Sequence, residues 1–326
     1  MSLDPAANGP ANGMDFADAE EISDQGERVS HLRRDAGYWA HLSIYDYAAQ
    51  LCADAIVLDA GSGAGYGSAF LAGRGARHVT GIDASPKAVA FSRHYFRQAN
   101  VAFQEMSLER IEEFPAQGFD LIFSSNTLEH VPGVQAFLAS AHHLLKPGGT
   151  LLAAVPPITD DRLKYLNLIN PYHVNIWSPR QWAHTLGLYF EAIQPVLHGV
   201  VSAGTDFKPE HFTAASRLTE KSFVFTPGSV EDMDHTFTLT AIFVARQPRA
   251  ASQLPAADAP LQFVDESFTR PAGYIDPALR LKLKKYFDMP APPFIVPAGD
   301  ASGPTRFIGK IKSALRAFIS RRPAGR

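Results

Sequence analysis

The segment Val57–Ser68, VLDAGSGAGYGS, combines residue types that bind a ligand through the backbone. A short apolar run ends in Asp59, glycine then occupies every second position from Gly61 to Gly67, and residues 66–73 have helical character. This order predicts a strand, a glycine turn and a helix start, which together bring backbone N–H groups against a polar or anionic ligand. Glycine also permits positive φ and a close approach to the ligand, because it has no Cβ.

The loop does not carry the dinucleotide fingerprint GxGxxG or GxGxxA. In the registers that begin at Gly61, Gly63 and Gly65, the sixth residue is an aromatic residue or a serine. The sequence therefore argues against an NAD-dependent enzyme, and the loop fits the pattern DxGxGxG instead.

A second acidic residue, Asp83, ends the next predicted strand, residues 78–83. It follows the glycine loop by about 20 residues, the separation at which a ribose-binding carboxylate is expected. A carboxylate can accept hydrogen bonds from two vicinal hydroxyl groups at once. We therefore expect Asp83 to bind the ribose of a nucleoside ligand.

A third set of polar residues could move a proton. Glu129 and His130 follow the apolar strand 119–125, at the carboxyl end where open α/β sheets place their chemistry. His173 lies in a connection rich in aromatic residues and asparagine, 158–177. Neutral imidazole is available at pH 7 as a general base. For Glu129 and His130, a helix start and a group packed behind the site are equally good interpretations, whereas we favour an active-site role for His173.

The elements that must position these residues alternate between strand and helix. Helical spacing from Arg28 to Cys52 predicts a leading helix. Four of its side chains could reach into the cleft or form an inner aromatic stripe: Arg28, His31, Tyr38 and Tyr45. We expect an α/β fold with a Rossmann-like seven-stranded sheet that is mostly parallel, has an antiparallel last strand and carries helices on both faces. The predicted strands are 55–59, 78–83, 101–103, 119–125, 150–155, 190–197 and 236–246, with a long loop from 200 to 233.

Composition narrows the class of protein. At 326 residues with 46% hydrophobic residues, the chain can bury a large core. Its formal net charge of −3 argues against a nucleic-acid partner, which usually requires a basic face. The single cysteine, Cys52, excludes an intrachain disulfide and fits a cytoplasmic location. Residues 1–27 are acidic, lack a secretory signal and are expected to be mobile, and no apolar run approaches the roughly 18 residues of a spanning helix.

The last part of the chain changes in composition. The composition of residues 249–305 predicts a Pro/Ala-rich linker with a short helical extension. Residues 306–326 combine an apolar face with basic residues, which predicts a basic amphipathic helix. Such a helix could contact the anionic inner face of a membrane, or it could pack on its own chain with a solvated basic face.

Four blocks in order resemble the class I S-adenosyl-L-methionine (SAM)-dependent methyltransferase superfamily: VLDAGSGAGYGS, VTGIDAS, FDLIFSSNTLEHV and LLKPGGTLLAAVP. They are similar in particular to UbiG-like and O-antigen- or glycan-associated bacterial O-methyltransferases. The resemblance implies that residues 28–248 form a methyltransferase domain in which 158–177 is a lid. It further implies SAM contacts from Asp59, Gly61, Gly63, Tyr66, Asp83, Ala84, Ser107, Leu108 and Ser124.

Some members of that superfamily place a divalent metal on an ExxEH segment and a later histidine. Asn126 replaces the first glutamate of that segment in this chain. Because an amide is a poorer ligand than a carboxylate for a hard cation, we expect no metal.

The sequence thus predicts a SAM-dependent O-methyltransferase that acts on a hydroxyl of a glycan or small metabolite. His173, His130 and Glu129 are its predicted catalytic residues. Two alternatives stay open: a phenolic or quinone-precursor methyltransferase, and a catalytically silent SAM-binding subunit that scaffolds a complex.

Overall fold

The computed structural model describes residues 28–32, 34–159, 161–170, 172–200, 218–236, 238–256 and 259–263. The acidic segment 1–27, the helical extension expected within 249–305, and the basic segment 306–326 lie outside the described residues. Among the residues that are described, no helix is both long and apolar enough to cross a membrane.

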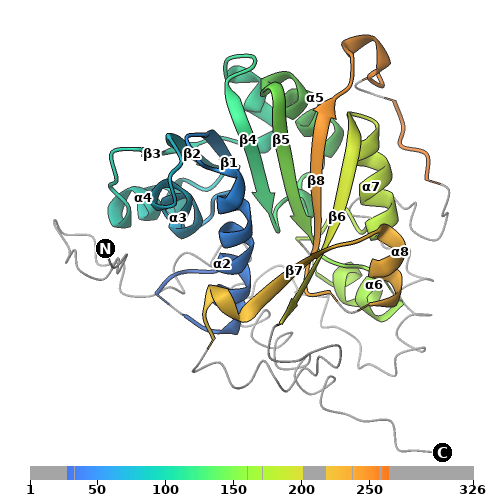
Figure 1. Cartoon of the computed structure of the whole chain (residues 1–326), viewed down its shortest axis with the longest axis horizontal. Coiled ribbons are helices and arrows are strands. Elements are labelled where there is room, and N and C mark those ends of the chain that lie inside the picture. The colour runs from blue at the N-terminus through green and yellow to red at the C-terminus, as the bar shows by residue number, and fades with distance from the viewer. Residues whose placement is uncertain are drawn as a thin grey trace, which may run out of the picture.

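One mixed sheet forms the centre of the fold (Figure 1). Its strands are β1 (Ile56–Ala60), β2 (His78–Asp83), β3 (Val101–Glu105), β4 (Phe119–Ser125), β5 (Leu145–Val155), β6 (Phe190–Val200), β7 (Phe223–Pro227) and β8 (Ala241–Pro248). They lie in the order β3-β2-β1-β4-β5-β8-β6-β7. The strands from β3 to β5 are parallel, whereas β8, β6 and β7 pair antiparallel. The order reverses between β1 and β4, the place where open α/β sheets bind their ligands.

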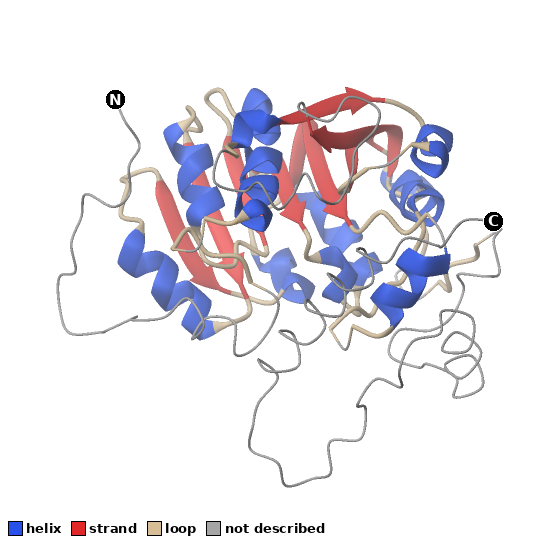
Figure 2. Cartoon of the chain, turned by 90° about the horizontal axis from the view of Figure 1, so that it is seen from below, coloured by secondary structure: helices blue, strands red, loops and turns tan. Residues whose placement is uncertain are grey.

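Helices cover both faces of this sheet (Figure 2). The α-helices are α2 (Ala36–Ala48), α3 (Tyr66–Gly73), α4 (Pro86–Tyr95), α5 (Val134–Leu144), α6 (Asp161–Leu168), α7 (Pro179–Gly187) and α8 (Val230–His235). Short 3-10 turns are η2 (Ala49–Leu51), η3 (Leu108–Glu113), η4 (Leu128–His130), η8 (Glu220–Ser222) and η9 (Ala251–Gln253). The side chains of Asp35, Ser85 and Ser178 accept hydrogen bonds from the first turns of α2, α4 and α7, which explains where these helices begin.

The predicted fold class is confirmed, with differences in detail. The ranges expected for β2, α3 and β4 match the structure, and β8 is antiparallel as predicted. The expectation of one long loop over 200–233 is wrong, because β7 and α8 lie within it and β7 adds an eighth strand. The predicted insertion 158–177 contains a helix, α6.

Two apolar cores lie on the two faces of the sheet. One packs α5 and α7 against the sheet and includes Phe137, Trp182 and Phe243. The other packs α2, α3 and α4 against it and includes Tyr45 and Phe91. The strands between β1 and β8 are therefore covered on both sides, which explains their near-continuous apolar sequences.

Helix α2 is held against both the parallel and the antiparallel part of the sheet. Its Tyr45 ring lies 4.5 Å from the ring of Phe123 in β4. On the antiparallel side, Ser43 hydrogen-bonds to His198 of β6 at 3.0 Å, and Tyr47 stacks on Phe225 of β7. The extra strand β7 thus supports the helix that covers the carboxyl ends of β1 and β4 (Figure 1).

We expect Phe243→Ala to lower the free energy of unfolding by about 3–5 kcal/mol, because this ring is fully buried in β8. Val224, in β7, is 44% exposed, so Val224→Ala should change that free energy by no more than about 0.5 kcal/mol. Urea denaturation of both variants checks this. Equal losses in the two would contradict the assignment of the core.

Candidate SAM site and acceptor pocket

A pocket of about 360 Å³ opens at the carboxyl ends of β1, β2 and β4. It is lined by the glycine loop, by the segments that follow β2, β3 and β4, by α2, and by the segment just before α2. The lining residues are Arg28, Val29, His41, Tyr45, Gly61, Ser62, Gly63, Ala64, Tyr66, Asp83, Ala84, Ser107, Leu108, Glu109, Ser125, Asn126, Thr127, His130, Val131, Pro132 and Tyr172.

The glycine loop turns its backbone toward this pocket. The N–H groups of Gly61 and Ser62 donate to the carbonyl oxygen of Ile82 at 2.9 and 2.8 Å, which fastens the loop to β2. Gly63 has a φ of +53°, and a Cβ built on it would meet no protein atom within 4 Å. Such a Cβ would therefore take up space in the pocket, which is why glycine suits this position.

Asp83 lies at the end of β2, as the sequence predicts, and its carboxylate faces the loop. Its Oδ1 accepts from the N–H of Ser85 at 2.8 Å, and its Oδ2 accepts from the N–H of Gly63 at 3.0 Å. The guanidinium of Arg28 also donates to Oδ1, at 3.1 Å. The carboxylate is thus oriented by backbone groups from the loop and from the start of α4.

Asp59 lies beneath the loop and does not line the pocket. Its carboxylate accepts from the hydroxyl of Ser68 at 2.6 Å and from the hydroxyl of Tyr45 at 3.2–3.3 Å. Burial raises the pKa of Asp59 to about 7, against the lowering effect of these two hydrogen bonds. Asp59 therefore ties α2 and α3 together under the pocket floor.

The imidazole of His130 lines the pocket. Its Nδ1 lies 2.9 Å from the carbonyl oxygen of Tyr172. A carbonyl can only accept, so Nδ1 carries the proton, and in the neutral ring Nε2 holds the lone pair. This Nε2 lies 3.8 Å from Oε1 of Glu129, whose side chain is 2% exposed.

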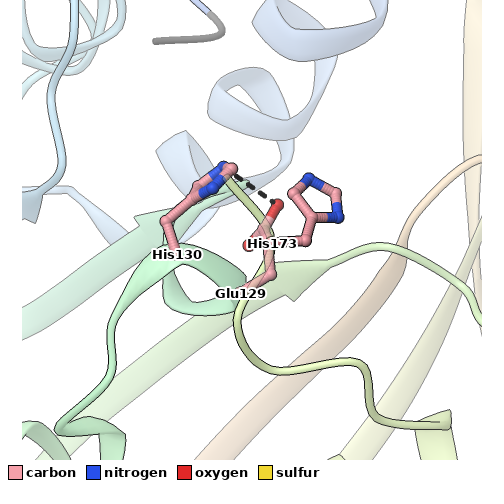
Figure 3. Close-up of side chains that lie close together, drawn as sticks. All are labelled: Glu129, His130 and His173. Atoms are coloured by element: carbon pink, nitrogen blue, oxygen red, sulfur yellow. Dashed lines mark ion pairs between the residues drawn. The ribbon is translucent and has the colours of Figure 1, made fainter. Parts of the chain in front are cut away.

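His173 does not line the pocket and packs against His130, with the ring centres 4.8 Å apart. The amide nitrogen of Asn167, in α6, donates to the carbonyl of Leu163 at 2.7 Å, which turns its amide oxygen toward His173. Nδ1 of His173 then donates to that oxygen at 2.6 Å. Figure 3 shows Glu129, His130 and His173 gathered together, and its dashed line joins Glu129 to His130.

The predicted lid is fastened to η4 by hydrogen bonds. The N–H groups of Val174 and Asn175 donate to the carbonyl of Glu129 at 2.8 and 3.0 Å. The side-chain amide of Asn175 donates to the carbonyls of Leu128 and Val131 at 2.8 and 2.7 Å. These bonds hold the histidine of one segment against the glutamate and histidine of the other.

The structure brings most of the predicted site residues to one pocket. Those that line it are Gly61, Gly63, Tyr66, Asp83, Ala84, Ser107, Leu108 and His130. Ser124, in β4, does not line the pocket, and its hydroxyl donates to the carbonyl of Ala60 in the neighbouring strand β1 at 2.9 Å. Glu129 and His173 do not line the pocket and lie next to His130.

Sequence reasoning missed His41, which lines the pocket one helical turn before Tyr45. Its spacing of four residues from Tyr45 on one helix could have revealed it. The backbone carbonyl of Tyr172, which orients His130, carries no sequence signal.

Glu129, His130 and His173 each offer a ligand atom within 4.8 Å of the others. The set contains a single carboxylate, and the amide of Asn126 is turned to the hydroxyl of Ser125 at 3.1 Å. This donor set does not suit a hard cation such as Mg²⁺, which prefers several oxygen ligands. The absence of a metal remains a prediction.

Residues 58–153 match the methyltransferase domain family. They contain the glycine loop, Asp83 and the strand that leads to Glu129 and His130. The chain carries a class I SAM-dependent methyltransferase domain. The cofactor of this domain is SAM.

The methyltransferase domain is similar to that of named relatives over part of their length. The ubiquinone biosynthesis O-methyltransferase of Paramagnetospirillum magneticum is 42% identical over 100 residues, which are 30% of this chain and 39% of that protein. The chain thus spans about two fifths of this relative. A probable SAM-dependent methyltransferase of Mycolicibacterium smegmatis is 25% identical over 67% of this chain and 93% of its own length. A crystal structure of a SAM-dependent methyltransferase from Mesorhizobium loti aligns with a TM-score of 0.48 and 19% identity, over 65% of this chain and 98% of that one.

The residues of the pocket fit SAM. Asp83 offers acceptors for a ribose diol, and Gly63 leaves space for a ligand beside the loop backbone. Asn126 and Thr127, after β4, line the pocket between the loop and His130.

Asp83→Asn should weaken the binding of SAM and of its demethylated product S-adenosylhomocysteine (SAH) by at least about tenfold, because charge-assisted hydrogen bonds to the ribose are lost. Asp54→Asn is the matched control, since Asp54 pairs with Arg77 on the surface and does not line the pocket. Isothermal titration calorimetry measures both. Unchanged affinity in Asp83→Asn would refute the ribose contact.

The raised pKa of Asp59 predicts a pH effect on stability. Between pH 3.8 and about 7 the folded protein holds a proton at Asp59 that the unfolded chain releases. The free energy of unfolding of the wild type, relative to Asp59→Asn, should therefore fall as pH rises through this window and become flat above it. Chemical denaturation of both proteins from pH 4 to 8 measures the difference. A difference that rises with pH would contradict the shift.

Proposed function

We propose that this protein is a SAM-dependent O-methyltransferase that methylates a hydroxyl group of a small metabolite or glycan. One observation carries the proposal: His130, whose ring is fixed by a contact of Nδ1 with the carbonyl of Tyr172, lines the pocket that the glycine loop and Asp83 also line. A hydroxyl acceptor needs a base within hydrogen-bond reach, and a neutral imidazole is suited to this task at pH 7.

When bound, SAM supplies an electrophilic methyl group on a sulfonium ion, whose S–CH₃ bond breaks as the O–CH₃ bond of the product forms. The glycine loop and Asp83 would hold the donor, and the pocket walls would align the acceptor oxygen with the methyl group. Nε2 of His130 would accept the hydroxyl proton. The buried carboxylate of Glu129, 3.8 Å away, would stabilise the imidazolium that results.

The residues behind His130 would keep the ring in its productive orientation. The carbonyl of Tyr172 holds Nδ1–H, so that a proton can only arrive at Nε2. His173 packs against this ring and is itself oriented by Asn167. The predicted catalytic role of His173 would then be exerted through His130.

A phenolic hydroxyl is a second candidate acceptor. The similarity to ubiquinone biosynthesis O-methyltransferases favours it. The pKa of a phenol, about 10, also lies closer to that of imidazole than the pKa of an aliphatic alcohol does. Three tyrosines line the pocket, Tyr45, Tyr66 and Tyr172, and their rings could stack on either a phenol or a sugar.

We further propose that the enzyme works in the cytoplasm and that residues 306–326 contact an anionic membrane surface. The basic and apolar pattern of that segment supports this, and a lipid-linked acceptor would suit it.

Transfer of the labelled methyl group from SAM to a panel of acceptors tests the proposal. Product with a catechol or phenol, or with a sugar hydroxyl, identifies the acceptor class. Tight SAM binding without turnover on any hydroxyl would support a silent scaffold subunit and contradict the proposed transfer.

His130→Ala should lower kcat by about a hundredfold or more with little change in SAM affinity, because a general base contributes a factor of 10²–10⁴. His173→Ala should lower kcat less, because His173 acts through His130. His143→Ala is the matched control, since His143 is exposed on α5 and does not line the pocket. Steady-state kinetics and calorimetry on the three variants measure these effects, and full activity in His130→Ala would remove this residue from the mechanism.

A further inference from the structure

Arg28 forms an ion pair with Asp83, whose carboxylate would bind the ribose of the cofactor. Its Nη2 donates to Oδ1 of Asp83 at 3.1 Å, and the two side chains are 15% and 11% exposed. Arg28 and Val29 also line the pocket. The ion pair therefore stands inside the proposed SAM site, not beside it.

The hydrogen-bonding capacity of Asp83 does not allow this ion pair and a ribose diol together. A carboxylate offers about four acceptor positions, two on each oxygen. Ser85 N–H and Arg28 occupy those of Oδ1, and Gly63 N–H occupies one of Oδ2. One position is left, whereas a diol needs two.

Of the three donors, Arg28 is the one that can leave. Ser85 is the N-cap residue of α4, and the loop that carries Gly63 is fastened to Ile82. Arg28, in contrast, contacts Asp83 through a flexible side chain. Its Nη1 is buried and has no hydrogen-bond partner among the described residues. Burying such a group costs free energy, so the contact is easily displaced.

The segment Arg28–His31, which we call the strap, has a second anchor. The ring of His31 is 7% exposed. It lies 5.7, 4.9 and 5.0 Å from the rings of Phe91, Tyr95 and Phe96, in and just after α4. Burial lowers the pKa of His31 to about 4, so the ring is neutral at physiological pH and packs as an apolar group. The strap therefore reaches from the aromatic cluster of α4 to the carboxylate in the pocket.

We propose that the strap is an autoinhibitory element: Arg28 competes with the ribose of the cofactor for Asp83, and SAM must displace it to bind. The proposal rests on the proposed function, because it takes the SAM site as its starting point. In this arrangement, the strap lowers the affinity of the protein for its cofactor and slows cofactor binding.

Arg28→Met removes the ion pair and keeps most of the apolar stem. SAH is the probe, because it carries the same ribose and its binding needs no turnover. We expect Arg28→Met to bind SAH about fivefold more tightly than the wild type, the gain expected when one competing ion pair is lost. Arg74→Met is the matched control, because Arg74 pairs with Asp46 outside the pocket, and its SAH affinity should equal that of the wild type.

A pair of substitutions at the second anchor tests the strap without touching Arg28. His31→Ala empties the space between the aromatic rings, whereas His31→Phe keeps it filled. Stopped-flow measurement should show faster SAH association in His31→Ala and an unchanged rate in His31→Phe.

Equal or weaker SAH binding in Arg28→Met, with SAH still bound by the wild type, would overturn the strap and leave the cofactor assignment standing. Equal association rates in both His31 variants would also overturn it. Failure of both the wild type and Arg28→Met to bind SAH would overturn the cofactor assignment and the strap with it.

Discussion

The hydrogen bonds that fasten the loop after β1 to the end of β2 are the constraint on which the rest of the site depends. Gly61 and Ser62 donate to Ile82, and Gly63 donates to Asp83 in the next position. Because β1 and β2 are parallel neighbours, their carboxyl ends meet at one edge, and these bonds turn the loop backbone toward the pocket. A side chain at Gly63 would fill that space.

The second half of the site is assembled from segments far apart in the chain. The end of β4 continues into η4, and residues 172–175 are bound to η4 through backbone and amide hydrogen bonds. Those bonds place Tyr172 where its carbonyl orients His130. The glycine-loop side of the pocket is therefore built from local strand–turn–helix units, and the His130 side from a contact between residues 42 positions apart in the chain.

This difference explains what the sequence could predict. The glycine loop, Asp83 and the strands around them follow from local patterns, and residues such as Gly63 and Asp83 lie where their spacing indicates. Strand β7 could not be predicted, because its short sequence has no strong alternation and its place is set by pairing with the distant strand β6 and by packing on α2. Asp59 was expected to touch the cofactor, but spacing alone does not show that Tyr45 and Ser68 would surround it. The orientation of His130 depends on a backbone carbonyl, which no residue type marks.

A crystal structure of the protein with SAH bound tests the central claim most directly. We expect the ribose hydroxyls to bind the carboxylate of Asp83, the amino-acid tail to lie against the backbone of the glycine loop, and the sulfur to face His130. SAH bound elsewhere, or a ribose that makes no contact with Asp83, would contradict it.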